Sequence, residues 1–503
     1  MSTMRVCALL FCLILPISLV AAQAATEDPG RAAFDKGVEA YNNRDFQGAR
    51  THFAEALKSY PGNATVLTWL GTTCYELKQW DEAIDNLSKA TQADPKYSVA
   101  FNNLGNACLE KGTEILKGGN EKDGRALLEK AVGGYQTAIG LKETYFYPRY
   151  NLAITYTRMK EWDKAWKAFT DATKVKPDDP DVWKSFGRAL KEAGEYDKAL
   201  DRYAKAADLD KKCVECAVQL GWLNSKLGHW PEAEQAYKGA VTLEADNFDA
   251  QLGLGIALYS QKKYPEARAP LTRAGELHAD SFEARYDLGL TEDSLNNLPA
   301  ADSAYRAALA LKANDVPCLN NLGVVIYKQD KPCDAVTQFR AAVAGDASYV
   351  MAQINLALAL EACGKDDQAA LDQWKAVVKA FPRQASAHCG LANALYRRKD
   401  LDGALAEYLR CLELDDRNVE AHDNVGLIFL DKGQSAEAIA HFRQALQVDP
   451  KNLAALNNLG VTYEKMGKPD EARKYYEQAL QIDPNCQRAK ENLDRLKGAG
   501  GGH

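Results

Sequence analysis

The cysteines are the residues of this sequence that most suggest chemistry, and two of them have a spacing with known uses. Cys213 and Cys216 are separated by two residues, as in redox pairs, zinc sites and haem-attachment sites. The strand and helix that surround a redox pair are missing, no second such pair or matched histidines complete a zinc site, and no His follows Cys216. We therefore interpret the two residues as a local structural disulfide or as two unpaired thiols.

The rest of the sequence supplies no catalytic constellation. An enzyme needs a nucleophile, a base and a charge stabiliser held together, and the common motifs for hydrolases, phosphate loops, dinucleotide folds and metalloproteases are missing. One His/Cys pair is close, His388 and Cys389, but neighbours in a helix point in different directions. The histidines are His52, His229, His278, His388, His422, His441 and His503. The sequence predicts no enzyme, no metal site and no cofactor.

Asparagines recur in one register of a repeated spacing. A carboxamide donates and accepts hydrogen bonds at once, so a row of them can bind the backbone of a peptide whatever its side chains. The six are Asn103, Asn151, Asn321, Asn355, Asn424 and Asn458. We predict a peptide-binding ladder; the alternative is that Asn suits a solvated position and was copied with the repeat. Because the ladder breaks at Ser185, Gln219, Gly253 and Asp287, we expect two stretches, the C-terminal one, broken at Gly390, being the stronger.

A repeat with a dominant step of 34 residues positions these asparagines at its position 6. Each copy has a small residue at position 8, Ala at position 20 and usually Ala at position 27. Two helices joined by a tight turn explain the pattern, because helices about 8–10 Å apart leave no room for bulky side chains where they cross. The thirteen copies are residues 30–63, 64–97, 98–145, 146–179, 180–213, 214–247, 248–281, 282–315, 316–349, 350–384, 385–418, 419–452 and 453–486.

Other repeated positions fit the same helical hairpin. Position 17 is often aromatic, and Pro at position 32 stops the second helix. Gly at position 15 suits the turn, because Gly adopts positive φ at little steric cost. These glycines are Gly112, Gly194, Gly228, Gly364, Gly433 and Gly467. With its period, the chain resembles the tetratricopeptide-repeat family over residues 30–486.

The resemblance implies both fold and function. It implies an all-α solenoid, a right-handed superhelix of helical hairpins, whose groove is lined by the first helices and binds other proteins or peptide segments. The asparagine motifs resemble the repeat arm of the O-linked N-acetylglucosamine transferase family, in which matching asparagines grip the peptide backbone. The catalytic domain of that family has no counterpart in this sequence, which leaves an accessory of such a transferase as one further hypothesis.

The repeat array departs from regularity at three places. Repeat three carries about fourteen extra residues, within 114–130, which we interpret as an extended hairpin with a polar tip rather than as a dedicated partner contact. Repeat ten has one extra residue before Ala370. Residues 487–497 are predicted to form a capping helix and residues 498–503 a flexible tail, because the end of a solenoid otherwise exposes its hydrophobic face.

The positions of the cysteines within the repeats indicate which of them could form a disulfide. Cys389 and Cys411 occupy positions 5 and 27 of repeat eleven, which face each other in an antiparallel hairpin, so they are the best candidates for a longer disulfide. Cys74 and Cys108 share position 11 of neighbouring repeats and are expected to be packed as small apolar residues.

The first residues are unlike the repeats. Arg5 is followed by an almost wholly apolar run from Val6 to Val20 and by a small-x-small site ending at Ala24. This pattern predicts a secretory signal peptide over residues 1–24, with an uncleaved anchor as the alternative. We expect the mature protein to be exported across the inner membrane into the periplasm, with no membrane span of its own.

Composition narrows the function further. A net charge of −7 and a pI near 5.7 argue against a nucleic-acid groove, which presents concentrated basic charge. We expect a non-enzymatic scaffold that binds partner proteins or peptide segments outside the cytoplasm. The alternative is a structural, self-associating solenoid within an envelope or exopolysaccharide export assembly.

Overall fold

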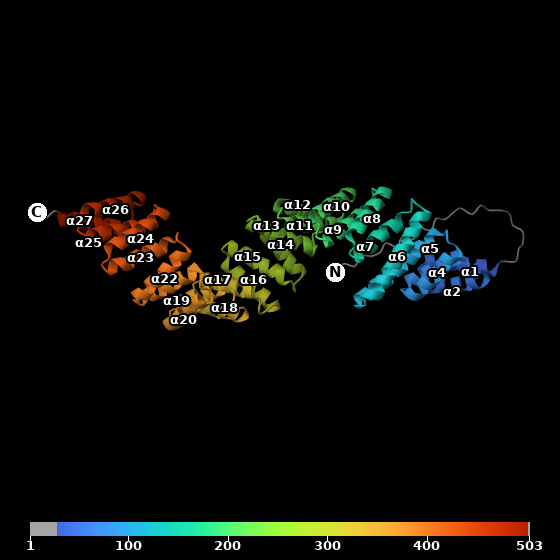
Figure 1. Ribbon diagram of the computed structural model, residues 1–503, viewed down its shortest axis with the longest axis horizontal. Coiled ribbons are helices and arrows are strands. Elements are labelled where there is room, and N and C mark those ends of the chain that lie inside the picture. Colours follow the sequence, from blue (N-terminus) through green and yellow to red (C-terminus); the bar gives the residue numbers. More distant parts are fainter. Residues whose placement is uncertain (1–27, 501–503) are drawn as a thin grey trace. The chain divides into compact units, whose positions relative to one another are not determined.

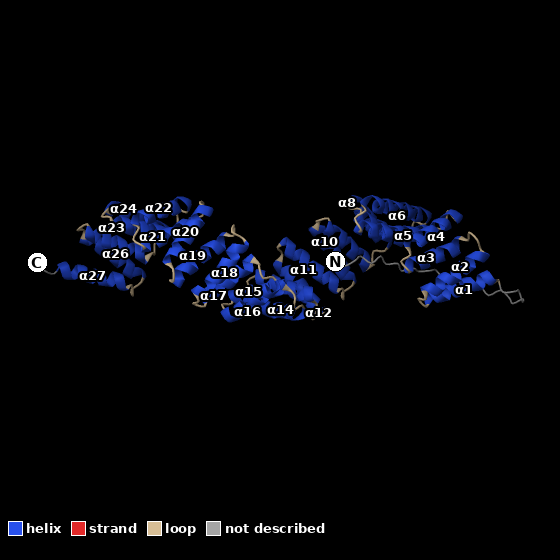
Figure 2. Ribbon diagram, turned by 90° about the horizontal axis from the view of Figure 1, so that it is seen from below, coloured by secondary structure: helices blue, strands red, loops and turns tan. Residues whose placement is uncertain are grey.

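The computed structural model describes residues 28–500, with side chains to residue 496, and every element in this range is an α-helix. Within each of two compact modules the helices pair into antiparallel hairpins that stack in chain order (Figures 1 and 2). Contacts divide the chain into two compact modules, with the boundary after Gln261. The predicted all-α solenoid of tetratricopeptide-type hairpins is confirmed. The predicted signal peptide, residues 1–24, lies outside the described residues.

The N-terminal module holds the helices of the first six repeats and the first helix of the seventh. Its helices are α1 (Pro29–Asn42), α2 (Phe46–Ser59), α3 (Ala64–Glu76), α4 (Trp80–Ala93), α5 (Ser98–Lys117), α6 (Glu121–Leu141), α7 (Phe146–Arg158), α8 (Trp162–Val175), α9 (Pro180–Glu192), α10 (Tyr196–Leu209), α11 (Val214–Leu227), α12 (Trp230–Leu243) and α13 (Phe248–Ser260).

The C-terminal module completes the seventh repeat and adds six more with a final helix. Its helices are α14 (Tyr264–Leu277), α15 (Phe282–Ser294), α16 (Leu298–Leu311), α17 (Val316–Lys328), α18 (Pro332–Gly345), α19 (Val350–Cys363), α20 (Asp367–Ala380), α21 (Ala385–Arg397), α22 (Leu401–Leu414), α23 (Val419–Asp431), α24 (Ser435–Val448), α25 (Leu453–Lys465), α26 (Pro469–Ile482) and α27 (Gln487–Gly500).

The glycine at position 8 has a structural reason that the sequence pattern alone did not reveal. An aromatic ring at repeat position 24, in the second helix, lies directly against it: a Cβ added to Gly323 would stand 2.6 Å from the Phe339 ring, and one added to Gly460 would stand 2.3 Å from the Tyr476 ring. The rings are buried. Position 24 is Phe53, Tyr135, Phe169, Tyr203, Tyr237, Tyr305, Phe339, Trp374, Tyr408, Phe442 and Tyr476, with Leu87 and Leu271 in the remaining repeats. In most repeats the hairpin is therefore closed by a ring packed on the position 8 glycine, and Leu87 takes this place against Gly71.

The extra residues of repeat three lengthen both of its helices, α5 and α6, around a turn at Gly118–Asn120. This moves the turn away from Gly112, which the repeat pattern placed in it. Gly112 instead lies inside α5 and is buried, and Gly119 has the positive φ of the turn. The prediction for Gly112 was wrong because the register was continued across the insertion.

The final helix covers the end of the array. Leu493 and Leu496 of α27 are buried in one cluster with Leu459 and Tyr476 of the last repeat. The helix continues to Gly500, so the sequence placed its end, at Lys497, too early.

The turn between the two helices requires a left-handed residue whether or not it is Gly. Lys78, at position 15, has φ 59° and is exposed. A left-handed non-Gly residue costs about 1–2 kcal/mol, partly offset because Gly loses more freedom on folding. We therefore expect Lys78→Gly to raise the free energy of unfolding by about 0.5–1 kcal/mol in urea titrations. Lys89→Gly, inside α4, is the control and should lower the free energy of unfolding by about 1 kcal/mol. If both changes had the same effect, the left-handed conformation at Lys78 would not be the cause.

Candidate functional site

The first helices of the repeats, which are the odd-numbered helices, come together on one side of each module. In the C-terminal module α17 contacts α19, α23 contacts α25, and α25 contacts α27. Within the described residues, no two even-numbered helices approach one another to a comparable degree. We call the exposed side of the odd-numbered helices the first-helix face. It carries repeat positions 2, 5, 6 and 9, and thus the predicted asparagine ladder.

The two N-terminal asparagines of the ladder are buried. Asn103 is 6% exposed and its Nδ2 donates to Thr72 Oγ1 at 2.9 Å. Asn151 is 1% exposed and its Nδ2 donates to Asn106 Oδ1 at 2.8 Å. Both amides hold consecutive first helices together, and neither side chain can reach a ligand without rearrangement. We therefore remove these two residues from the candidate ladder.

The four C-terminal asparagines are half-buried and accessible on the first-helix face. Each uses its Nδ2 to donate to the preceding repeat: Asn321 to the Tyr286 hydroxyl (3.1 Å), Asn355 to Asn320 Oδ1 (2.9 Å), Asn424 to the Tyr408 hydroxyl (3.0 Å) and Asn458 to Asp423 Oδ1 (3.0 Å). Nothing within residues 28–496 donates to Oδ1 of Asn355, Asn424 or Asn458. The structure thus fixes all four carboxamides and leaves the acceptor of these three open, whereas Oδ1 of Asn321 accepts from Asn320 Nδ2 at 3.4 Å.

Aromatic rings explain two of the breaks in the ladder. A Cβ at Gly390 would lie 2.3 Å from the Trp374 ring, and one at Gly253 would lie 2.2 Å from the Tyr237 ring. Any side chain at these positions would collide with a buried ring from the second helix of the preceding repeat. The sequence pattern showed the breaks but could not show the rings beneath them.

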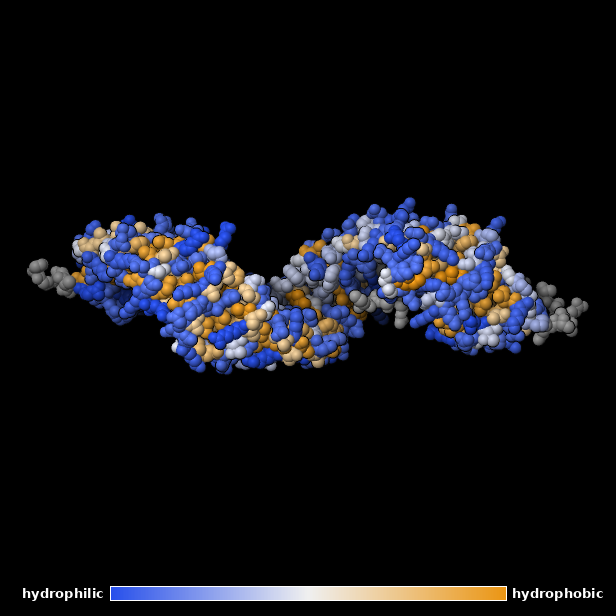
Figure 3. All heavy atoms as spheres, turned by 60° about the horizontal axis from the view of Figure 1, so that its bottom comes forward, coloured by the Kyte–Doolittle hydropathy of each residue, from blue (hydrophilic) through white to orange (hydrophobic). Residues whose placement is uncertain are grey.

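An apolar row lies beside the asparagines, three residues further along each first helix. It comprises Leu290, Val324, Leu358, Leu427 and Val461. Leu358 is exposed, and the other four side chains are partly exposed. Leu358 is 41% exposed, and with Tyr327 and Arg397 it lines a cleft of about 430 Å³ between α19, α20 and α21. Figure 3 shows hydrophobic patches at the surface among hydrophilic residues. This face can therefore contact both the backbone and the apolar side chains of an extended segment.

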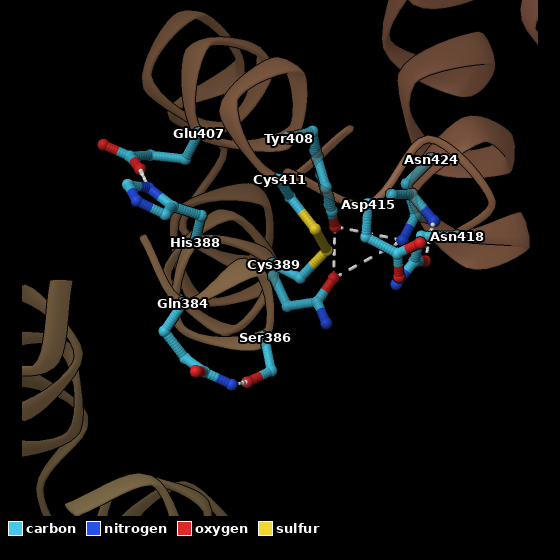
Figure 4. Close-up of a disulfide and its surroundings, with 12 residues drawn as sticks. Gln384, Ser386, His388, Cys389, Glu407, Tyr408, Cys411, Asp415, Asn418 and Asn424 are labelled. Carbon is cyan, nitrogen blue, oxygen red and sulfur yellow. Dashed lines mark hydrogen bonds and ion pairs between the residues drawn. A yellow bond between two sulfur atoms is a disulfide. The ribbon is translucent and has the colours of Figure 1, made fainter. Parts of the chain in front are cut away.

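Three disulfides are present in the described residues. Cys389 in α21 bonds Cys411 in α22, beside the Tyr408 hydroxyl that contacts Asn424 (Figure 4). Cys213 bonds Cys216 at the start of α11. The third, Cys333–Cys363, was not foreseen, because it joins the start of α18 to the end of α19 and thus crosses between repeats. Cys74 and Cys108 are free and buried.

Two histidines of the C-terminal module make the same kind of bridge between the helices of a hairpin. His388 Nδ1 lies 2.6 Å from Glu407 Oε2, on the far side of the helix from Cys389 (Figure 4). One repeat later, His422 Nδ1 lies 3.2 Å from His441 Nδ1, and the His441 ring stacks on Phe429. No group of three His, Cys, Asp or Glu side chains within the described part of the chain is arranged to hold a metal ion.

The histidine pair predicts a pH dependence of stability. Burial, and next the neighbouring His422, lower the pKa of His441 below its usual value near 6.5. As pH falls through 6.5 the unfolded chain therefore takes up this proton first, and stability is lost until the lower folded pKa is passed. We expect His441→Phe, which keeps the ring stack, to flatten the loss of stability between pH 7 and pH 5 in urea titrations. An unchanged slope would assign the loss to other groups.

Comparison with known proteins agrees with the geometry. The tetratricopeptide-repeat family profiles match residues 34–98, 150–212, 218–276, 366–418 and 418–485, together more than half of the chain. The chain belongs to the tetratricopeptide-repeat family. Tetratricopeptide repeats mediate interactions with proteins or peptides, and the fold is typically a non-catalytic scaffold. No helix of residues 28–500 is long and apolar enough to span a bilayer.

The chain spans only a small part of the curated relatives that it matches. A barley protein described as a probable UDP-N-acetylglucosamine–peptide N-acetylglucosaminyltransferase, SPINDLY, is 30% identical over 125 residues, 25% of this chain and 12% of that protein. Anaphase-promoting complex subunit 6 of Arabidopsis thaliana is 29% identical over 153 residues, 30% of this chain and 25% of that protein. The crystal structure of YrrB, described as having an unusual peptide-binding site, covers 37% of this chain and 97% of its own, at 24% identity and a TM-score of 0.35.

Proposed function

We propose that this tetratricopeptide-repeat protein is a non-enzymatic scaffold that binds extended peptide segments of partner proteins on the first-helix face of its C-terminal module. The observation that carries the proposal is the row of Asn321, Asn355, Asn424 and Asn458, each held by its amide, in which Asn355, Asn424 and Asn458 offer a carbonyl oxygen. Such acceptors bind backbone N–H groups of any sequence, while the apolar row beside them adds contact area. Pre-fixed side chains also lower the entropy cost of binding.

We further propose that it acts outside the cytoplasm, in the periplasm. The apolar run near the start of the sequence supports export. The three disulfides support an oxidising compartment, since such bonds are rare in the cytosol. Expression with a reporter fused after residue 30, followed by fractionation and N-terminal sequencing, tests this. A mature chain starting near residue 25 in the periplasmic fraction is expected, and cytoplasmic full-length protein would overturn it.

Mutation of the ladder tests the binding function. The double change Asn424→Ala and Asn458→Ala should weaken capture of a partner peptide by about five- to 150-fold, because each lost acceptor removes roughly 0.5–1.5 kcal/mol. Helicity and melting should change little, because both residues are partly exposed and the gain in helix propensity on replacement by Ala offsets the lost hydrogen bonds to the preceding repeat. Asn314→Ala, at an exposed position in the turn before α17, is the matched control. The peptides come from a phage-displayed library selected on the immobilised wild-type protein. If the folded double variant bound them as tightly as the wild type, the binding site would have to lie elsewhere on the protein.

A further inference from the structure

Three adjacent first helices, α17, α19 and α21, form an uncharged stretch of the first-helix face. Their positions 2, 5, 6 and 9 hold no Asp, Glu, Lys or Arg, and all of these residues except the buried Asn320 and Ile354 are at least partly exposed. These positions are Pro317, Asn320, Asn321, Val324, Met351, Ile354, Asn355, Leu358, Ser386, Cys389, Gly390 and Asn393. Besides His388, the charges on these helices lie in their last turns and are paired: Lys328 with Asp293 at 2.7 Å, and Arg397 with Glu361. A ligand lying along this stretch meets amides and apolar groups alone.

Acidic pairs stand at both ends of the uncharged stretch. On α15, the helix before it, Glu283 and Asp287 occupy positions 2 and 6; on α23, the helix after it, Glu420 and Asp423 occupy positions 2 and 5. Within each pair the carboxylates lie one turn of helix apart and repel each other. Two pairs of like charge therefore flank a neutral surface.

These four carboxylates are not bonded to any cation in the described part of the chain. Among the described residues, none of Glu283, Asp287, Glu420 and Asp423 forms an ion pair. Lys312, which is close enough to Glu283 to sense its charge, is bonded to Asp315 at 2.7 Å.

The surroundings of two of these carboxylates disfavour their ionised form. Burial, and then the neighbouring Glu283, raise the pKa of Asp287 to about 6. Burial is also the main influence that raises the pKa of Asp423, with Glu420 adding to it and the bond from Asn458 opposing it. A cation supplied by a ligand would relieve this penalty, because an opposite charge within a few Å favours the ionised carboxylate.

We propose that the partner segment has an uncharged, apolar middle with Lys or Arg residues at both ends, which pair with Glu283 and Asp287 at one end and with Glu420 and Asp423 at the other. Four steps between neighbouring first helices, at about 10 Å each, give a span of roughly 40 Å. An extended chain at about 3.3 Å per residue covers this span with roughly 12 residues. This inference rests on the proposed binding of a peptide to the same face and adds its sequence class.

Selection from a random library tests the inference directly. Phage-displayed 16-residue peptides are selected on the full chain, and the recovered sequences should be enriched in Lys or Arg near both ends around an uncharged centre. A second selection uses the variant Glu283→Gln, Asp287→Asn, Glu420→Gln and Asp423→Asn, from which that enrichment should disappear. The matched control removes four exposed carboxylates from second helices: Asp334→Asn, Glu437→Gln, Glu471→Gln and Glu477→Gln.

Titration of the consensus peptide then separates the outcomes. Binding should weaken at least about tenfold in the four-site variant and not in the control, and it should weaken with added NaCl because accessible ion pairs are screened. Selected peptides without basic ends, or equal binding by the four-site variant, would overturn this inference; if such peptides still need Asn424 and Asn458, the proposed function stands. Failure to select any peptide over an unrelated protein would overturn both. Circular dichroism of each variant confirms that it is folded.

Discussion

Replacement of Gly323 by Leu is expected to lower the free energy of unfolding of the C-terminal module by about 3 kcal/mol. Gly323 lies in α17, directly beneath the Phe339 ring of α18, and even a methyl group there would stand 2.6 Å from the ring. Phe339 is 1% exposed and cannot move aside. Overpacking of a well-filled core costs about 1–3 kcal/mol and occasionally more, and a branched side chain at this contact forces the two helices apart.

A second glycine in the same module separates this clash from the effect of losing Gly. Gly275 lies in α14, and a Cβ there would meet nothing within 4 Å. Gly275→Leu should therefore stabilise the protein by about 0.5–1 kcal/mol, because Leu has the better helix propensity. Urea unfolding compares the two variants, and hydrogen exchange should show the loss of protection concentrated in α17 and α18, since repeats interact with their neighbours only. Equal stability of the two variants would mean that the position 8 glycines do not lock the hairpins.

The periodic small residues were enough to predict the hairpins from the sequence, since only close helix crossings need them at fixed spacing. The ring that fills the space over each glycine was missed. Aromatic residues at position 24 look like ordinary core positions in the sequence, and their contact with position 8 of the same repeat appears only when the hairpin is closed. Gly390 illustrates the limit: the sequence shows a gap in the ladder, whereas the Trp374 ring explains it.

The candidate site was predictable in its register but not in its extent. Position 6 was correctly placed on a first helix, yet Asn103 and Asn151 are buried by neighbouring helices, which depends on the local packing of each repeat. The acidic pairs, exemplified by Glu283 and Asp287, were visible as residues. What the sequence could not show is that, among the described residues, these carboxylates form no ion pair, and that Lys312, which senses the charge of Glu283, is bonded to Asp315.

The longer disulfides were also predictable only in part. Cys389 and Cys411 lie at positions that an antiparallel hairpin brings together, so hairpin geometry alone made them the best candidates, and the structure pairs them. Cys333 and Cys363 lie at the start of a second helix and the end of the next first helix. Their pairing depends on how one repeat stacks on the next, and repeat ten carries an extra residue at this place.

Removal of the two longer disulfides is expected to destabilise the C-terminal module by about 2–4 kcal/mol for each bond. Cys333–Cys363 and Cys389–Cys411 close loops of sequence separation 30 and 22, and cross-links of this size restrict the unfolded chain most strongly through loop closure. Cys411 is also 0% exposed, so Ala is the replacement that leaves no unsatisfied polar group. We therefore expect the variants Cys333→Ala/Cys363→Ala and Cys389→Ala/Cys411→Ala each to unfold at clearly lower urea concentration.

The local bond between Cys213 and Cys216 provides the internal comparison. Its sequence separation is 3, so it restricts the unfolded chain least, and Cys213→Ala/Cys216→Ala should cost less than either longer bond, with the loss confined to the N-terminal module. The same ranking should appear when the wild-type protein is unfolded with and without a reducing agent. If the C-terminal module unfolded at the same urea concentration in both conditions, the disulfides would not contribute to its stability.

The Cys389–Cys411 bond also matters for binding, because the half-buried Asn424 is held by Tyr408, which lies three residues before Cys411 on α22. A hairpin loosened by reduction would lose the fixed carboxamide along with its stability, and peptide affinity should fall in parallel.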